Sequence, residues 1–278
     1  MYTDRFKPRR SVEKRYAAAI NRIMEGLRRR LTGASSPFQM LQVLRGFARS
    51  PTLDKEVREA AGSMATSLFH DGARSWREAA RRGSRGRAIY LLLKKERAHR
   101  SEISAIVEQN SKLIKSMTSR VASKVAHEMD KGQMEGKRPE ELMKQVVARW
   151  PQLTRAHALL IARTESSKAT TALTRVRAES AGLSWYVWKT SKDARVRSSH
   201  SHMDGVICSW KDPPSPENLL HQKDYGHYAP GEIFNCRCYP APLLDYGDVS
   251  WPHKVYLNGR IRMMTLAAFK KLNGGGSL

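Results

Sequence analysis

The sequence has few cysteines and no long apolar run. Only three of its 278 residues are cysteine, all between positions 208 and 238, which is too few and too local for a disulfide framework. The most apolar run, Ala88–Leu93, is about a third of the roughly 18 residues that a membrane-spanning helix needs. The basic N-terminus lacks the apolar core of a secretory signal. We therefore expect a chain that is made inside the cell and does not span a membrane.

Acidic residues are also scarce. The chain has 50 Lys and Arg against 26 Asp and Glu, a net charge of +24. Residues 1–150 hold 33 basic and 16 acidic residues, whereas residues 201–250 hold 3 and 7. With 40% hydrophobic residues, the composition excludes collagen-like chains and whole-chain disorder. The charge predicts an anionic partner for the N-terminal two-thirds.

From Ser11 to about Ser180 the sequence predicts one helix after another. This region is rich in Ala, Leu, Arg, Lys, Glu and Met, and apolar residues return every three or four positions, which is the period of a helix with one buried face. One such stripe consists of Ala17, Ile20, Ile23, Met24 and Leu27. Glycine, serine and proline predict breaks at residues 33–37, 50–51, 83–86 and 131–136, and a further helix is expected over 153–180.

After Gly182 the composition changes. Residues 184–190 are aromatic and β-branched and predict a strand. Residues 255–257 and 261–263 predict a hairpin across Asn258-Gly259. The expected fold class is therefore α+β, with mainly helical N-terminal two-thirds and a small, loop-rich α+β C-terminal module. We expect a basic helical domain over residues 1–180, the module over 181–262 and a tail over 263–278, whose last residues, 274–278, are expected to be flexible.

The cysteines and histidines of the module are placed to share a metal ion, although Cys-x-Cys is tighter than the usual ligand spacing of two to four intervening residues. Cys236 and Cys238 are two residues apart, so in an extended segment both sulfurs point to one side. Zn²⁺ binds Cys and His tetrahedrally and can hold together a module that is poor in regular structure. The spacing favours zinc bound by His200, Cys236 and Cys238. A fourth ligand is open among Asp193, His202, Cys208, His221 and His227.

Three other interpretations of these residues stay open. The cysteines can be buried apolar residues without chemistry. Cys208 beside His200 or His202 can be a reactive thiol. The clustered His, Asp and Asn beside a basic surface can form a metal-dependent nuclease, although the sequence has no paired-carboxylate pattern.

The basic clusters of the helical region are not interrupted by the aromatic residues that a base-stacking surface shows. They are suited to contacts with phosphate that do not read the sequence of a nucleic acid. The alternative is that each is a solvated helix face. The candidate nucleic-acid-binding residues are Arg28, Arg29, Arg30, Arg81, Arg82, Arg85, Arg87, Lys94 and Lys95.

Five motifs in order carry a family resemblance. They are Ala162-Arg163-Thr164-Glu165, Tyr186-Val-Trp-Lys-Thr190, Asp193-Ala-Arg-Val-Arg197, His200-Ser-His-Met-Asp-Gly205 and Asn235-Cys-Arg-Cys-Tyr-Pro240. Together they resemble the phage head morphogenesis family of minor head proteins, the Mu F-like proteins, over residues 161–240. The family's signature positions fall on Arg163, Glu165, Asp193, Arg197, His200, Asp204, Gly205, Asn235, Cys236 and Cys238.

The resemblance implies a structural protein of a tailed phage. A minor capsid protein of this kind is located in the phage head near the portal vertex and is associated with the portal oligomer, with the major capsid or scaffolding protein as further partners. It is expected to contact packaged double-stranded DNA without sequence specificity. We expect no catalytic activity, and Glu165 is expected to pair with Arg195 or Arg197. The segment Glu232-Ile-Phe234 departs from the His-Pro step expected before Asn235, which leaves His227 as a weak substitute ligand.

Overall fold

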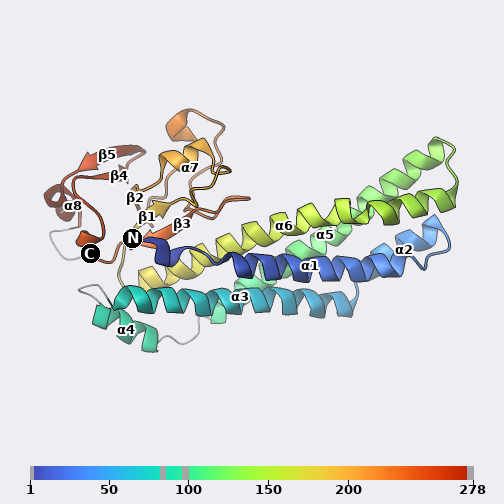
Figure 1. Ribbon diagram of the computed structural model, residues 1–278, viewed down its shortest axis with the longest axis horizontal. Coiled ribbons are helices and arrows are strands. Elements are labelled where there is room, and N and C mark those ends of the chain that lie inside the picture. The colour runs from blue at the N-terminus through green and yellow to red at the C-terminus, as the bar shows by residue number, and fades with distance from the viewer. Residues whose placement is uncertain (1–2, 82–85, 96–99, 274–278) are drawn as a thin grey trace. The chain divides into compact units, whose positions relative to one another are not determined.

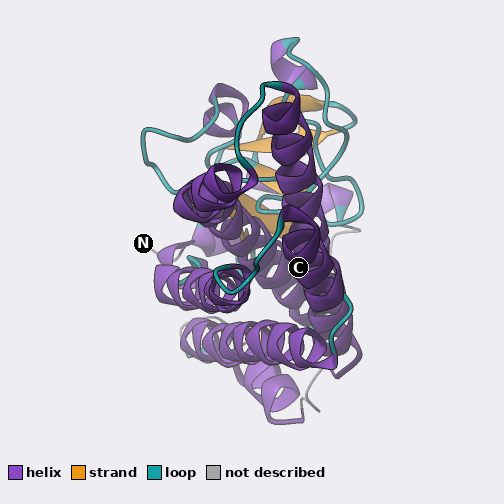
Figure 2. Cartoon of the chain, turned by 90° about the vertical axis from the view of Figure 1, so that its right-hand side faces the viewer, coloured by secondary structure: helices purple, strands orange, loops and turns teal. Residues whose placement is uncertain are grey.

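The computed structural model describes residues 3–81, 86–95 and 100–273. Most of this chain is helical, and one five-stranded sheet lies in its C-terminal part (Figures 1 and 2). The predicted α+β class with helical N-terminal two-thirds is confirmed. The helices of this part are α1 (Arg10–Leu31), α2 (Pro37–Ala48), α3 (Pro51–Ala80), α4 (Gly86–Lys95), α5 (Arg100–Met134) and α6 (Pro139–Ser180), preceded by the short 3₁₀ helix η1 (Thr3–Phe6).

The chain divides into two compact units. The sheet unit comprises Met1–Arg9, Ser67–Glu102 and Ser166–Leu278, and the helical unit comprises Arg10–Thr66 and Ile103–Glu165. This division differs from the expected boundary at residue 180, because the second part of α3, helix α4 and the last part of α6 belong to the same compact unit as the sheet.

The helices of the helical unit follow the apolar period of the sequence. The predicted stripe of α1 is buried, including Ile20, Met24 and Leu27. Helix α2 begins where Ser36 caps it, accepting a hydrogen bond from the Gln39 amide at 3.2 Å, with proline in the first turn. The predicted breaks at 33–37, 50–51 and 131–136 coincide with helix ends. Of the break expected at 83–86, positions 83–85 lie outside the described residues.

The expected start of a helix near residue 153 is wrong. Helix α6 begins at Pro139 and continues through Pro151 to Ser180. Proline inside a helix loses one backbone hydrogen bond and costs about 3 kcal/mol or more. The uninterrupted helix buries Trp150, Thr154 and Ala158 on one face at four-residue intervals. We attribute the continuity to this burial, which offsets the cost of the proline.

The sheet contains the strands β1 (Trp185–Lys189), β2 (Ile207–Ser209), β3 (Tyr239–Pro242), β4 (His253–Leu257) and β5 (Arg260–Met264), in the order β3-β1-β2-β4-β5. Strand β1 pairs antiparallel with β2 and β3, and β2 pairs parallel with β4. The predicted strand at 184–190 and the predicted hairpin are present. Asn258 and Gly259 have positive φ, as a two-residue hairpin turn requires.

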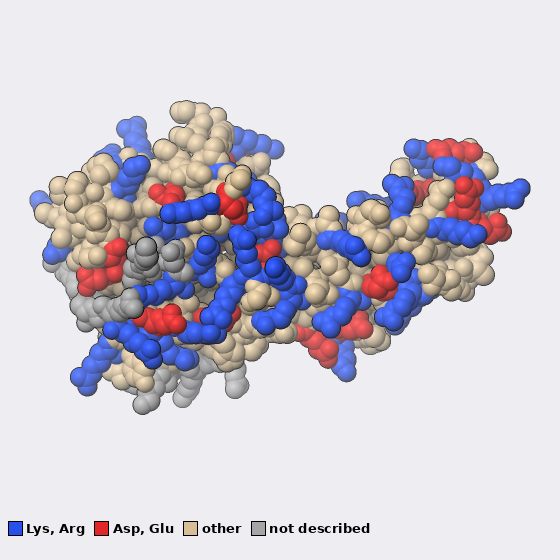
Figure 3. Space-filling view, viewed as in Figure 1, with Lys and Arg blue, Asp and Glu red and all other residues tan. Residues whose placement is uncertain are grey.

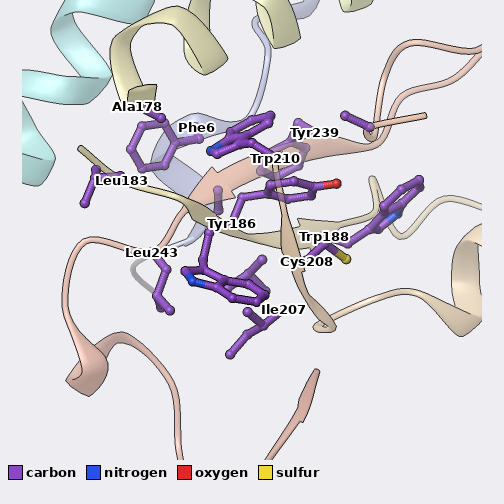
Figure 4. Close-up of a cluster of buried hydrophobic side chains, with 14 of the residues drawn as sticks. Phe6, Ala178, Leu183, Tyr186, Trp188, Ile207, Cys208, Trp210, Tyr239 and Leu243 are labelled. Atoms are coloured by element: carbon purple, nitrogen blue, oxygen red, sulfur yellow. The ribbon is translucent and has the colours of Figure 1, made fainter. Parts of the chain in front are cut away.

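The core of the sheet unit is aromatic. Tyr186, Trp188 and Trp210 pack together with aliphatic side chains on and beside β1 (Figure 4). Tyr186 and Trp210 have ring centroids 4.3 Å apart.

The prediction of a tail from residue 263 is wrong for the described residues. Strand β5 extends to Met264, and α8 (Leu266–Leu272) follows it. The buried ring of Phe269 lies 5.0 Å from Trp185 and 5.1 Å from Trp251, centroid to centroid. Phe269 is the buried residue through which this short helix packs against the core. Residues 274–278 lie outside the described residues. Across the described ranges, no helix has the length and apolarity to cross a membrane.

Candidate metal centre

His200, Cys236 and Cys238 meet in the sheet unit. His200 lies on α7 (Ser198–His202), and the two cysteines lie in the segment that leads into β3. His200 Nδ1 is 3.3 Å from Cys238 Sγ and 3.5 Å from Cys236 Sγ. The three side chains are only 2–3% exposed, and their ligand atoms all lie within 4.8 Å of one another. The structure thus brings together the three residues that the sequence favoured.

The segment that carries the cysteines is fixed against α6. Thr171 Oγ1 donates a hydrogen bond to the Pro230 carbonyl oxygen at 2.6 Å. Gly231 has φ +96°, and a Cβ atom at this position would lie 2.7 Å from Thr171 Oγ1 and 2.9 Å from Ser167 Oγ. Glycine therefore permits both the turn and the close approach to the helix. Near the cysteines, the Cys238 amide donates to Cys236 Sγ at 3.3 Å.

The other side of the His200 ring faces a buried carboxylate. Tyr228 Oη lies 3.0 Å from His200 Nε2 and donates to Glu217 Oε2 at 2.6 Å. Glu217 Oε1 accepts from Ser199 Oγ at 3.0 Å and lies 3.6 Å from His200 Nε2. Glu217 and Tyr228 could not be predicted from the sequence, because an isolated acid and an isolated tyrosine in a proline-rich loop have no spacing that links them to His200.

The two cysteines differ in acidity. A hydrogen bond with the Cys238 thiol, together with the adjacent His200 ring, lowers the pKa of Cys236 to about 4, although burial acts in the opposite direction. The hydrogen bond with Cys236 and burial raise the pKa of Cys238. Burial raises the pKa of Cys208 as well, and its Sγ is directed at the Val206 carbonyl oxygen at 3.7 Å. This environment keeps Cys208 a neutral thiol, which disfavours it as a nucleophile.

Asp193 is not part of the cluster. Its carboxylate accepts from Arg237 Nη1 at 3.0 Å, from Ser191 Oγ at 3.2 Å and from the Arg195 amide at 3.1 Å. Hydrogen bonds from Arg195, Arg237 and Ser191 lower its pKa despite the opposing effect of burial. The prediction that Asp193 is a ligand is therefore wrong for this arrangement, because Arg237, on the residue between the cysteines, holds the carboxylate.

The other candidates for a fourth ligand also lie elsewhere. His202 and His221 are exposed, and His227 Nδ1 lies 2.8 Å from the Pro213 carbonyl oxygen. Within the described part of the chain, the group that could hold a metal contains three residues and none of these candidates.

The family-motif residues on α6 make contacts in the helical unit. Arg163 Nε lies 3.1 Å from Glu13 Oε1, and both side chains are largely buried. Gln109 Nε2 donates to Glu165 Oε2 at 3.2 Å. The expected pairing of Glu165 with Arg195 or Arg197 stays a prediction.

The remaining motif residues shape the loops around β1. Asp204 Oδ1 accepts from the Thr190 amide at 2.8 Å, and Gly205, with φ +85°, donates to the Trp188 carbonyl oxygen at 2.8 Å. Arg197 donates to the Phe234 carbonyl oxygen at 3.0 Å and lies over the Phe234 ring. Asn235 has φ +56°, which turns the chain just before Cys236. Their role in this structure is to place the loops that hold His200 and the cysteines.

The candidate nucleic-acid-binding residues are not equivalent. Arg29, Arg30, Arg81 and Arg87 are exposed. Arg30 also lies over the Phe47 ring, and Arg28 pairs with Glu25 at 2.7 Å. Arg82 and Arg85 lie outside the described residues, and so do the side chains of Lys94 and Lys95.

Comparison with known proteins gives one family match and one relative. The phage Mu protein F like family matches residues 123–240, which extends the resemblance to positions before residue 161. A protein of Haemophilus influenzae (strain ATCC 51907 / DSM 11121 / KW20 / Rd), named "Uncharacterized protein", is 36% identical over 147 residues. The alignment covers 53% of this chain and 30% of that protein, so the chain spans about a third of its relative. No solved structure matches. The resemblance drawn from the motifs is therefore confirmed: residues 123–240 match the phage Mu protein F like family, which indicates a phage head morphogenesis protein.

Proposed function

We propose that this chain is a minor head protein of a tailed phage that associates with the portal oligomer and contacts the phosphates of packaged DNA. The observation that carries the proposal is the family match over residues 123–240. Few copies per particle are expected for a protein located at the portal vertex, and the major capsid or scaffolding protein is a further partner in this proposal.

The charge of the chain supports the contact with DNA. The net charge of +24 is concentrated outside residues 201–250, and lysine and arginine are spread over the face seen in Figure 3. Among the predicted phosphate contacts, Arg29, Arg81 and Arg87 are exposed. Exposed guanidinium groups bind phosphate without reading base identity.

Quantitative mass spectrometry of purified particles tests whether this chain is a minor component of the virion. The chain should be present at a low, fixed ratio to the portal subunit and far below the major capsid protein. Absence of the chain from finished particles and from proheads would overturn the structural assignment.

Binding to double-stranded DNA at several salt concentrations tests the phosphate contacts. The logarithm of the binding constant should fall linearly with the logarithm of the salt concentration, with a slope of about −0.9 for each phosphate contacted. Alanine at Arg29, Arg81 and Arg87 should make this slope shallower. Arg175→Ala is the matched control, because Arg175 is paired with Glu179 at 2.8 Å.

Two outcomes would contradict the contact with DNA. Binding that does not depend on salt, or no binding, would assign the positive charge to protein partners. Cleavage of the DNA in the presence of Mg²⁺, Mn²⁺ or Zn²⁺ would instead favour a metal-dependent nuclease.

A further inference from the structure

We propose that His200 Nδ1, Cys236 Sγ and Cys238 Sγ bind one zinc ion, and that Glu217 and Tyr228 hold the His200 ring in the orientation that binds it. The proposal is independent of the contacts with portal and DNA. It rests on the distances within the cluster, on the direction of the hydrogen bonds around His200 and on the burial of the five side chains.

The cluster already has the dimensions of a zinc site. Tetrahedral Zn²⁺ has Zn–S distances of about 2.3 Å and Zn–N distances of about 2.0–2.1 Å, which place N and S ligand atoms about 3.5 Å apart. The two observed distances from His200 Nδ1 to sulfur are 3.3 and 3.5 Å. An ion can therefore be bound by these three atoms without a change in the path of the backbone.

The hydrogen bonds on the far side of the ring determine which nitrogen is free to bind. Tyr228 has a single hydroxyl hydrogen and donates it to Glu217 Oε2 at 2.6 Å. Tyr228 Oη must therefore accept from His200 Nε2–H, at 3.0 Å. A hydrogen fixed on Nε2 leaves the Nδ1 lone pair for a metal on the side of the sulfurs. Metal-binding histidines commonly have such a chain that ends at a carboxylate.

The charges of the site also suit an ion. Two thiolates and a neutral imidazole around Zn²⁺ form a centre with no net charge, which lowers the cost of its burial. Two sulfur ligands and one imidazole favour Zn²⁺ over Mg²⁺ or Ca²⁺, which prefer oxygen. Since the described residues supply three ligands, the fourth position is assigned to a water molecule.

The ion would stabilise the longest irregular segment of the sheet unit. Residues 210–238 join β2 to β3 and contain one 3₁₀ helix, η2 (Asn218–Leu220). Loops of this length are uncommon in a domain unless another interaction orders them. Zinc would join the end of this segment to α7, while Glu217 and Tyr228 join its middle to the same helix.

The metal content of the purified full chain tests the ligand set. Elemental analysis should find one zinc per chain in the wild type and in Cys208→Ser, and almost none in Cys236→Ser or Cys238→Ser. Cys208 is the matched control, because it is an equally buried thiol of the same unit outside the cluster. Equal zinc in all four proteins, or loss of zinc in Cys208→Ser, would overturn the assignment.

A second measurement uses only the wild-type protein and therefore does not depend on whether a variant folds. Removal of metal from the wild type by a chelator, followed by titration with Co²⁺ under reducing conditions, should give the visible bands of tetrahedral cobalt and a sulfur-to-cobalt charge-transfer band. No such absorption, or a Cys236–Cys238 disulfide in the protein as isolated, would overturn the proposal.

The positioning role of Glu217 has its own test. Glu217→Gln should weaken zinc binding by about 10–100-fold in competition with a chromogenic chelator, while its far-ultraviolet circular dichroism stays that of the wild type. Glu232→Gln is the control, because Glu232 accepts from the Ala229 amide in the same segment. Equal zinc affinity of Glu217→Gln and the wild type would show that Glu217 does not position His200.

Discussion

The helical unit and the sheet unit are packed around different kinds of side chain. The helical unit buries mainly aliphatic residues that recur at helical intervals, such as Ile20, Leu27 and Leu44. The sheet unit buries tryptophan and tyrosine around β1, together with the polar network of His200 and Glu217. An aliphatic stripe can be satisfied by several helix arrangements, whereas aromatic edges and buried polar groups each require a particular partner.

This difference predicts how the two units respond to change. The sheet unit should be sensitive to single side chains and to single backbone positions, because its long loops are ordered by specific contacts. The helical unit should be more tolerant, except where a buried polar group depends on one partner.

The largest effect is expected from Phe269→Ala. The ring is fully buried against Trp185 and Trp251, and its removal should cost about 3–5 kcal/mol of stability. Hydrogen exchange should become faster in β1 and β4, while α1 keeps its protection. Equal loss of protection in α1 would mean that the two units unfold as one and that the comparison between them fails.

A smaller effect is expected from Gly231→Ala, with Gly226→Ala as its control. Both glycines have positive φ, but only at Gly231 would the new Cβ meet other atoms, with Thr171 Oγ1 at 2.7 Å and Ser167 Oγ at 2.9 Å. Backbone strain should cost Gly226→Ala about 1–2 kcal/mol, and the clash should add about 1–3 kcal/mol at Gly231. Urea unfolding measures the stability of both variants. Equal losses of stability would show that the segment around Gly231 moves away from α6 without a cost in free energy.

The smallest effect is expected from Tyr16→Phe in the helical unit. Tyr16 donates to Asn110 Oδ1 at 2.8 Å, and both residues are buried. Burial, and then the charge of Glu165, raise the pKa of Tyr16, so the hydroxyl remains a donor. Loss of this donor should cost about 1–3 kcal/mol in thermal unfolding, whereas Tyr90→Phe, at an exposed tyrosine, should cost less than about 0.5 kcal/mol. If the stability of Tyr16→Phe equals that of the wild type, Asn110 accepts a hydrogen bond from another donor.

Short-range signals in the sequence were sufficient to predict several features of the structure. The stripe on α1 predicted its buried face, and Asn258-Gly259 predicted the turn between β4 and β5. Cys236 and Cys238 are two residues apart, which was sufficient to expect both sulfurs on one side of an extended segment, because alternate side chains in such a segment point to the same side. His200 is one of four histidines of the module that precede the cysteines, with His202, His221 and His227, so the sequence favoured His200 without excluding the others.

Other features depend on neighbours that are distant in the chain. A helix was expected to start only at residue 153, just after Pro151, yet the burial of Trp150 and Ala158 keeps α6 continuous through the proline. Phe269 alone gave no sign that residues beyond 262 belong to the core. Asp193 resembles a ligand in the sequence, but Arg237 holds its carboxylate.

The sequence by itself determined the helical character of the N-terminal two-thirds, the family resemblance of residues 161–240 and the pairing of Cys236 with Cys238, because periodicity, motif order and close spacing can be observed along the chain. Only the tertiary structure decided that Glu217 and Tyr228 complete the surroundings of His200 and that α8 is part of the core. The physical reason is that a buried hydrogen bond or ring contact depends on where the folded chain places its partner, and the spacing of the residues along the sequence does not specify that place.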